Sequence, residues 1–281
     1  MQKEYFSTLE MNEDEVNYLK LLKEMVYFKS NLSFLQRING LRPGATHLVI
    51  APPGGGKSTL CKTFIRDLQD NAPKSEKLAI NILVILSEQK INDLKSEFIN
   101  LPDFGNNKRK NIHIFSEMEL VDENHYHFNF MRIKEMIKFT GARVIIYDNL
   151  TTSQYYSVLP PWEQYQFCFT LKKLAEETQN ALILFAHTGA QFNKYAKRMI
   201  SVNDIRGTKD IVNLAQFVYI LQTFQIVDYK VTTVAVAKDR DYESEGQFYR
   251  LEYSSEMRVY KDCMRIDYNA IKAYFDKMDR L

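Results

Sequence analysis

A lysine and two hydroxyl residues follow three consecutive glycines in the first quarter of the chain. The segment from Thr46 to Thr59 reads THLVIAPPGGGKST. Its glycines allow backbone N–H groups to crowd around an anion where any Cβ would clash. Lys57 could then reach the β- and γ-phosphates of a nucleoside triphosphate, and the Ser58 hydroxyl could bind Mg²⁺. The pattern therefore predicts a phosphate-binding loop for ATP and Mg²⁺, made of Pro53, Gly54, Gly55, Gly56, Lys57, Ser58 and Thr59.

This loop has the sequence neighbours that such a motif needs. The apolar run over residues 47–50 predicts a buried strand before it, and residues 60–68 continue a helix after it. The positive N-terminal end of that helix would face the bound anion. Ala51 stands where the motif usually begins with glycine, which is the mildest such change. The alternative is a chance glycine turn, and the flanking strand and helix favour the phosphate loop.

Two carboxylates end apolar runs that predict other buried strands. Glu88 follows the run over residues 78–86, and Asp148 ends the run within residues 143–150. In open α/β sheets, ligands bind at the carboxyl ends of parallel strands. We expect Asp148 to lie at the tip of a strand next to the phosphate-loop strand, where it would bind Mg²⁺ together with Ser58.

His187 ends a further apolar run, over residues 180–187. Its imidazole could hydrogen-bond the γ-phosphate or the attacking water. A histidine at a strand end is more often an ordinary hydrogen-bonded polar residue. Both interpretations are open on the sequence alone.

Secondary structure must bring these residues together, and the periodicity of the chain predicts how. Apolar runs alternate with segments of helical spacing, which indicates an α/β fold with a mostly parallel central sheet. The last runs predict antiparallel strands at the C-terminal end. The expected helices cover residues 12–30, 60–68, 91–99, 128–139, 161–178 and 265–279; the expected strands cover 47–50, 78–86, 112–115, 143–150, 180–187, 217–221, 231–238, 247–253 and 257–260.

Composition restricts the class of protein. Hydrophobic residues make up 45% of the 281 residues and aromatic residues 13%, which favours a globular chain over a disordered one. The formal charge of +2 is too small to indicate nucleic-acid binding by itself, so a basic surface would have to be local. Cys61, Cys168 and Cys263 lack metal-binding spacing and predict reduced thiols. With no membrane-length apolar run and no signal-peptide pattern, we expect a cytoplasmic protein that has no membrane partner.

The series of motifs from about Asn39 to Tyr253 resembles the RecA-like ATPases, in particular the DnaB-like and plasmid RepA-like hexameric helicase cores. APPGGGKST is similar to their Walker A loop and IIYDNL to their Walker B strand. FAHTG is similar to the sensor stretch of the RepA-like members. The resemblance implies a RecA-like P-loop NTPase motor over residues 39–281. The helical spacing over residues 12–30 predicts a short N-terminal helical arm, residues 1–38, whose helix could pack on a neighbouring subunit or on its own domain.

The resemblance also implies catalytic roles. Lys57 and Asp148 match the residues that neutralise the phosphates, and Glu88 matches the glutamate that activates water. The stretch AVAKDRDYESEGQFYRLEY is similar to the segment that extends a lysine and an arginine into the nucleotide of the neighbouring subunit. These two roles fall on Lys238 and Arg240, and His187 would report the state of the γ-phosphate.

We therefore expect a homo-oligomer, a hexameric ring by family likeness, that hydrolyses ATP at subunit interfaces and moves on single-stranded DNA as a replicative helicase. The likeness allows a primase or initiator protein as a further partner. In the loop over residues 189–204, we expect Lys194, Lys197 and Arg198 to grip the DNA backbone in a central pore. An ordinary solvated loop is the alternative.

Two other functions remain compatible with the motifs. The first is a RecA/RadA-like or KaiC-like ATPase that does not unwind DNA. The second is an ATP-gated DNA-binding scaffold or a helicase-loading protein. Both use the same core, because a fold does not determine a function.

Overall fold

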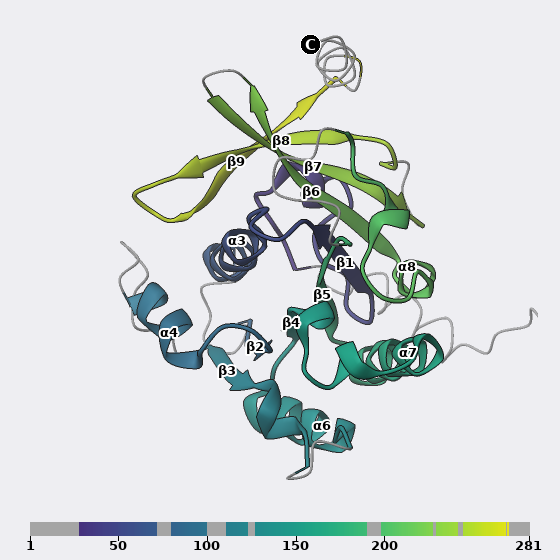
Figure 1. The fold of residues 1–281 in the computed structure, drawn as a ribbon. Coiled ribbons are helices and arrows are strands. Elements are labelled where there is room, and N and C mark those ends of the chain that lie inside the picture. Colours follow the sequence, from purple (N-terminus) through teal and green to yellow (C-terminus); the bar gives the residue numbers. More distant parts are fainter. Residues whose placement is uncertain are drawn as a thin grey trace, which may run out of the picture.

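The computed structural model describes residues 28–71, 80–99, 111–122, 127–189, 198–226, 229–240, 244–267 and 269. Within these residues, nine strands form one sheet in the order β3-β2-β4-β5-β1-β6-β7-β8-β9 (Figure 1). The central position of β1 places the loop that follows it in the middle of one edge of the sheet.

The first six strands of that order are parallel to one another. Four of them, β1, β2, β4 and β5, are buried along their whole length, because helices cover both faces of the sheet. This explains their continuous apolar sequence and confirms the predicted parallel sheet. Their bounds are β1 Thr46–Ala51, β2 Ile82–Leu86, β3 Ile112–Ser116, β4 Val144–Asp148, β5 Ala181–His187 and β6 Phe217–Ile226.

The last three strands extend the sheet in antiparallel fashion from β6. They are β7 (Tyr229–Asp239), β8 (Phe248–Ser254) and β9 (Val259–Ile266). β1 pairs with β6 only as far as Ile220, whereas β6 continues to Ile226. The C-terminal strands therefore reach beyond the carboxyl edge of the parallel part, on the side of the phosphate loop.

The predicted closing helix is wrong at its start. Arg265 and Ile266 belong to β9, where they pair with Tyr249 and Phe248 of β8. Cross-strand pairing therefore outweighs the helical spacing of these two residues. The part of the predicted helix after residue 269 lies outside the described residues.

Two sets of helices cover the two faces of the sheet. Val49 and Ala51 of β1 face the core under α2, α3 and α4, and Leu48 and Ile50 face the core under α6, α7 and α8. This is the alternation expected of a strand. The helices are α2 Ser33–Gln36, α3 Lys57–Asp70, α4 Ile91–Ile99, α6 Phe130–Thr140, α7 Pro161–Thr178 and α8 Asp210–Leu214, and the short 3₁₀ helices are η2 Glu117–Leu120, η3 Leu150–Thr152, η4 Tyr156–Val158 and η5 Val202–Asp204.

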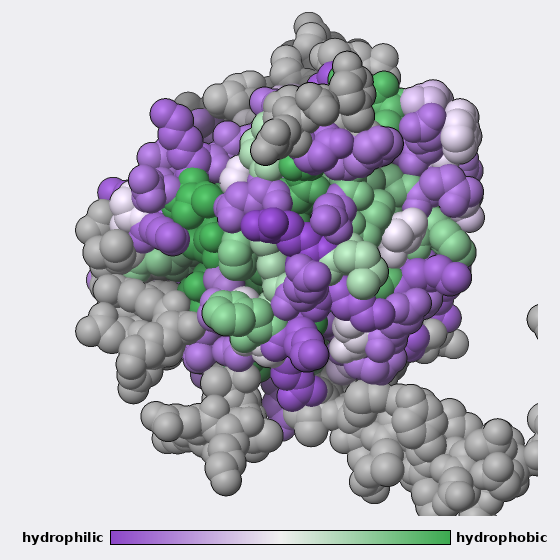
Figure 2. Space-filling view, turned by 90° about the horizontal axis from the view of Figure 1, so that it is seen from below, coloured by the Kyte–Doolittle hydropathy of each residue, from purple (hydrophilic) through white to green (hydrophobic). Residues whose placement is uncertain are grey.

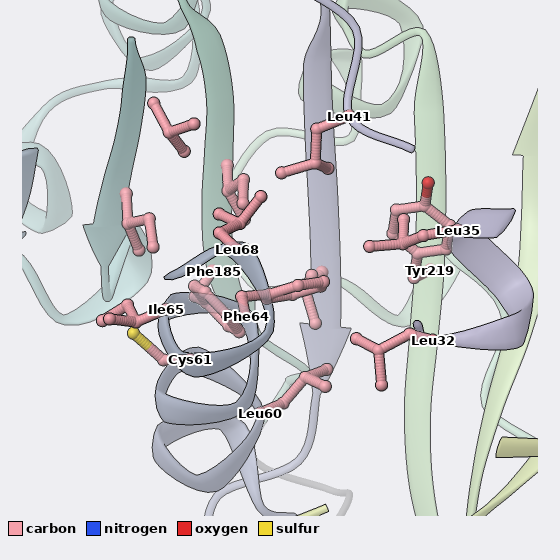
Figure 3. Packing of buried hydrophobic residues seen from close by; sticks show 14 of the residues in the cluster. Leu32, Leu35, Leu41, Leu60, Cys61, Phe64, Ile65, Leu68, Phe185 and Tyr219 are labelled. Carbon is pink, nitrogen blue, oxygen red and sulfur yellow. The ribbon is translucent and has the colours of Figure 1, made fainter. Parts of the chain in front are cut away.

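Helix α3 holds the phosphate loop against the middle of the sheet. Leu60, Phe64 and Leu68 recur at helical spacing and point into the core between the sheet and helices α2, α3 and α4 (Figure 3). The Phe64 ring lies edge-on to Phe185 of β5, with 6.2 Å between the ring centroids. Burial of these side chains fixes the N-terminal end of α3 at the end of β1.

Residues 28–38, which the sequence assigned to an arm, pack into the same core. Phe28 pairs with Leu41 through two backbone hydrogen bonds of 2.9 and 3.0 Å, and Phe34 lies edge-on to Tyr219 at 5.2 Å. The predicted helix over residues 12–30 is therefore wrong for residues 28–30, which form a bridge and extended chain. Its remaining residues lie outside the described part of the chain.

The surface seen from below mixes polar and apolar residues, with the apolar ones in small separate groups (Figure 2). Among the described residues, no helix has the length and apolar character needed to cross a membrane.

Candidate nucleotide site

The loop between β1 and α3 requires its glycines. Gly56 adopts a φ of +97°, in the left-handed region that favours glycine, and a Cβ on it would overlap the Tyr260 hydroxyl. The Gly55 N–H donates to the Pro52 carbonyl at 2.9 Å, and a Cβ on Gly55 would lie 2.9 Å from the Pro52 ring. The loop is thus closed on itself by backbone contacts.

This loop can hold a phosphate. Helix α3 begins at Lys57 with no capping side chain among the described residues, so the N–H groups of its first turn are free to bind an anion. Ser58 is exposed at the same end of the helix. The buried Asp148 carboxylate and the Ser58 hydroxyl are oxygen ligands of the kind that Mg²⁺ prefers. The site therefore fits the predicted ATP and Mg²⁺.

Three of the predicted site residues form a chain of polar contacts. Lys57 Nζ lies 2.6 Å from His187 Nδ1 and 3.3 Å from the Pro52 carbonyl oxygen. His187 Nε2 lies 3.3 Å from Glu88 Oε1. An ammonium group can only donate, so Nδ1 must accept and Nε2 must carry the ring proton and donate to the carboxylate. The neutral imidazole of His187 thereby links the Lys57 ammonium group to the Glu88 carboxylate.

Burial changes the protonation of this site. Burial lowers the pKa of Lys57 to about 8, although Asp148 and Glu88 act in the opposite direction. Burial likewise raises the pKa of Asp148 to about 6, against the attraction of Lys57. The hydrogen bond from His187 lowers the pKa of Glu88, which therefore stays ionised at neutral pH. Groups of both signs with shifted pKa values, gathered at one place, are typical of a functional site.

One expectation about the position of Asp148 is wrong. β4, which ends at Asp148, is not adjacent to β1, because β5 lies between them. The residue at the tip of the adjacent strand is His187, which is opposite Ala51 in the sheet register. Asp148 still faces the site across one strand, as its electrostatic interaction with Lys57 indicates.

Lys238 and Arg240 lie away from the loop of their own chain. Lys238 is opposite Val218 in the β6–β7 register, and Val218 is opposite Leu48 of β1. They therefore lie toward the amino edge of the parallel strands, about 10 Å along the strand direction from Ala51. Lys238 Nζ donates to the Val212 carbonyl at 2.6 Å and Arg240 Nη2 donates to the Asn213 carbonyl at 2.6 Å, both at the end of α8.

Arg198 forms a bidentate ion pair with Asp204, with N–O distances of 3.0 and 2.8 Å. The Gly189 N–H donates to the Asp204 carbonyl at 2.8 Å, so the loop over residues 189–204 closes at its base. Lys194 and Lys197 lie outside the described residues. The prediction that Arg198 contacts DNA stays a prediction, and in this structure its guanidinium is engaged by Asp204.

Sequence reasoning missed several residues that surround the site. Tyr260 of β9 packs against Gly56, and Ser87, Asn149, Thr151 and Thr152 hydrogen-bond around the ends of β2, β4 and β5. The pair of threonines three and four residues after the strand-end carboxylate of Asp148 is a weak signal, since hydroxyl residues are common in loops. Nothing in the sequence pointed to Tyr260.

Comparison with known proteins supports the fold assignment. A family model described as RNA helicase matches residues 47–150, from β1 to just past the end of β4. No curated protein matches the sequence. A KaiC-like protein from the hyperthermophilic archaeon Pyrococcus horikoshii OT3 has a similar structure, with a TM-score of 0.62, 16% sequence identity, and coverage of 85% of this chain and 98% of that chain. The chain thus has the RecA-like fold of P-loop ATPases.

Proposed function

We propose that this protein is a ring-forming ATPase that moves on single-stranded DNA, with each site completed by the neighbouring subunit. One observation carries the proposal. The candidate site residues gather at the carboxyl edge of the parallel strands: Lys57, Asp148, Glu88 and His187. Lys238 and Arg240 of the same chain lie toward the opposite edge. Phosphoryl transfer needs positive charge on the leaving oxygens, and a second copy can supply it.

In this mechanism, the residues of one chain hold and activate the reactants. Lys57 leaves His187 and binds the β- and γ-phosphates, while the free N–H groups of α3 surround them. Ser58 and Asp148 would hold Mg²⁺, which would supply further positive charge beside the phosphates. Glu88 takes the proton of the attacking water, since its lowered pKa keeps it ionised.

His187 would transmit the presence of the γ-phosphate to the loop over residues 189–204. When Lys57 moves to the phosphates, Nδ1 loses its donor and can accept a hydrogen bond from another group, while Nε2 still donates to Glu88. The His187 carbonyl accepts the Arg206 N–H at 2.8 Å, and Thr188 forms a bridge with Ile205. A change at the nucleotide is therefore coupled to both ends of the loop that we propose contacts DNA.

The proposal of a nucleic-acid substrate rests on the motif series and on the helicase family model that matches residues 47–150. The test is ATP hydrolysis by the purified protein, with and without single-stranded DNA or RNA, together with native mass in the presence of a non-hydrolysable ATP analogue. We expect stimulation by single-stranded DNA, falling with salt, and a ring-sized mass. Glu88→Gln should bind ATP and lose about 10²- to 10⁴-fold in turnover. Glu177→Gln, on the exposed surface of α7, is the matched control.

Hydrolysis that is indifferent to any nucleic acid would exclude the translocase and favour the second candidate, an ATPase without unwinding activity. The similarity to a KaiC-like protein over 85% of the chain is the observation that favours it. Transfer of the γ-phosphate to the protein itself, followed with radiolabelled ATP, would then identify a signalling ATPase. A protein that binds ATP and hydrolyses it only slowly would instead fit a scaffold or helicase-loading role.

A further inference from the structure

A buried glutamine on β6 holds the base of the loop over residues 189–204. Gln222 is 3% exposed, and its side chain hydrogen-bonds the main chain of two residues of that loop, Arg198 and Ile200. We propose that Gln222 is a positioning residue, which fixes where this loop leaves the sheet and so sets its affinity for single-stranded nucleic acid. This inference rests on the proposed function and names a residue that determines the geometry of its nucleic-acid contact.

The carboxamide of Gln222 pairs with the loop as a neighbouring strand would. The Ile200 N–H donates to Gln222 Oε1 at 2.9 Å, and Gln222 Nε2 donates to the Arg198 carbonyl at 2.8 Å. A backbone N–H can only donate and a carbonyl can only accept, so the two contacts assign the same orientation to the amide. The main chain of residues 198–200 thereby has two hydrogen bonds to β6 without belonging to the sheet.

Gln222 lies on an otherwise apolar face of β6. Ile220 and Phe224, two residues before and after it, are on the same face and are buried. A buried amide is tolerated in such a place only when its polar atoms have partners. Because the Ile200 main chain is buried as well, loss of the Gln222 amide would leave polar groups unpaired in the loop.

Apolar packing alone does not fix this part of the loop. Met199 contacts the buried pair of Phe224 and Phe248. A groove of about 280 Å³ nevertheless remains there, lined by residues 199–202 and by strands β6, β7 and β8. A segment beside such a space meets little steric resistance when it shifts. The directional hydrogen bonds of Gln222 therefore decide where the segment lies.

The segment that Gln222 holds is tied to both ends of the loop. The Asp204 carboxylate accepts the Ser201 N–H at 2.8 Å and pairs with the Arg198 guanidinium. The Asp204 carbonyl accepts the Gly189 N–H at 2.8 Å. The start and the end of the loop therefore share the position that Gln222 fixes.

β6 brings this contact to the level of the phosphate loop. β1 and β6 pair as far as Ile50 and Ile220, so Gln222 lies about 7 Å beyond the last pair, on the side of the phosphate loop. The preceding residue, Leu221, faces the opposite side of β6, where its Cδ2 would lie 3.7 Å from a Cβ on Gly56. One strand thus contacts the phosphate loop on one face and holds the proposed nucleic-acid loop on the other.

Gln222→Met keeps the length of the side chain and removes both hydrogen bonds. The concentration of single-stranded DNA that gives half-maximal stimulation of ATP hydrolysis should rise about fivefold to fiftyfold, because the base of the loop loses its fixed position. The rate without DNA and the KM for ATP should change less than about twofold, since the side chain faces away from the phosphate loop.

Thr223→Val is the matched control. It removes a hydrogen bond of 2.9 Å to Thr232 on the opposite face of the same strand, and it should leave the response to DNA unchanged. A half-maximal DNA concentration for Gln222→Met within twofold of the wild type, or an equal rise in Thr223→Val, would overturn the proposal. A raised KM for ATP with an unchanged response to DNA would overturn it too.

A second measurement needs neither DNA nor turnover. Hydrogen–deuterium exchange of the Ile200 amide, followed by NMR, should be slow in the wild type and about tenfold or more faster in Gln222→Met, with the amides of β1 unchanged. A wild-type Ile200 amide that exchanges as fast as an unprotected one would overturn the inference even if the variant does not fold. Protection that is lost in Gln222→Met, in a protein that binds no single-stranded nucleic acid, would contradict the proposed function alone.

Discussion

Burial and charge oppose each other at Asp148. Asp148 is 7% exposed, and Lys57, whose charge attracts the Asp148 carboxylate, is 6% exposed. Burial raises the pKa of the carboxyl group from 3.8 to about 6 despite that cation. The ionised Asp148 carboxylate therefore destabilises the nucleotide-free protein, and a bound divalent cation would offset this destabilisation.

Asp148→Asn should stabilise the nucleotide-free protein at neutral pH. Because the pKa in the folded state lies above the ordinary value, ionisation lowers stability as pH rises from about 3.8, and the loss is complete above about 6. The variant should gain up to about 3 kcal/mol in unfolding free energy at pH 7.5 and clearly less at pH 4.5. Urea unfolding at both pH values measures this gain.

The control for this experiment is Asp93→Asn, an exposed aspartate in the first turn of α4. It should be neutral or slightly destabilising at both pH values, since it removes only a favourable interaction with the helix dipole. An equal gain for Asp148→Asn at pH 4.5 and pH 7.5 would show that the buried charge is not the cause.

At this scale, the sequence identified the residues that meet at the site but not those that hold them. The site residues could be found because each lies at a helix start or at or just after a strand end that the periodicity reveals: Lys57, Glu88, Asp148 and His187. Thr151 could not, since its contact with the His187 N–H depends on where the chain turns after β4. The bidentate pair of Arg198 with Asp204 was equally hidden, because sequence spacing does not say which acceptor a loop arginine will meet.

The phosphate loop shows how one element is shaped by another far away in the sequence. Tyr260 of β9 packs its hydroxyl against Gly56, and its N–H donates to Thr63 Oγ1 of α3 at 2.9 Å. The antiparallel strands thus brace the first helix of the nucleotide site. Strand existence could be predicted here from alternation, whereas the length of β9 and its contact with the loop depend on tertiary pairing.

Gly56→Ala should be more destabilising than an ordinary substitution of a left-handed glycine. Gly246 provides the comparison, since its φ is +80° and a Cβ on it would have no neighbour within 4 Å. Gly246→Ala should lose about 1 kcal/mol for backbone strain alone, and Gly56→Ala should lose about 1 to 3 kcal/mol more from overpacking. Tyr260→Phe should recover part of the additional loss. Equal losses for the two alanine variants, measured by urea unfolding, would mean that the Tyr260 contact is unimportant.

In the whole molecule, the strand order keeps two of the predicted catalytic residues away from the others within one chain. The sequence named Lys238 and Arg240, but the order of strands that places them toward the opposite edge of the sheet could not be read from it. Pairing between distant strands is decided by the packing of the complete domain. This is why Asp148 was expected beside β1 and is found one strand further away.

Arg240→Ala should bind ATP nearly normally and hydrolyse it about 10³-fold more slowly if the arginine acts on the neighbouring subunit. Lys57→Ala should also be inactive, because its phosphates lose their cation. A mixture of the two variants should recover activity, since an intact loop can then lie beside an intact Arg240. Arg250→Ala, a half-exposed arginine on β8, is the control that should retain the wild-type rate.

Subunit exchange must be demonstrated for that mixture, for example by native mass spectrometry of differently labelled variants. A mixture that exchanges subunits and still fails to hydrolyse ATP in a single turnover would contradict action between subunits. Recovered activity cannot arise from action within one chain, because neither variant contains a complete set of residues.

The central position of β1 has a consequence for biosynthesis. This strand, which ends at Ala51, has β5 and β6 as its neighbours, and these begin only at residues 181 and 217. At ordinary rates of translation, roughly ten seconds or more pass between the synthesis of β1 and that of its second partner. Until β5 has been synthesised, β1 has neither of its sheet neighbours, and until β6 has been synthesised it has only one of them. We therefore expect a nascent chain to bind a nucleotide only once it extends past residue 220, so that the nucleotide does not guide the folding of the first half.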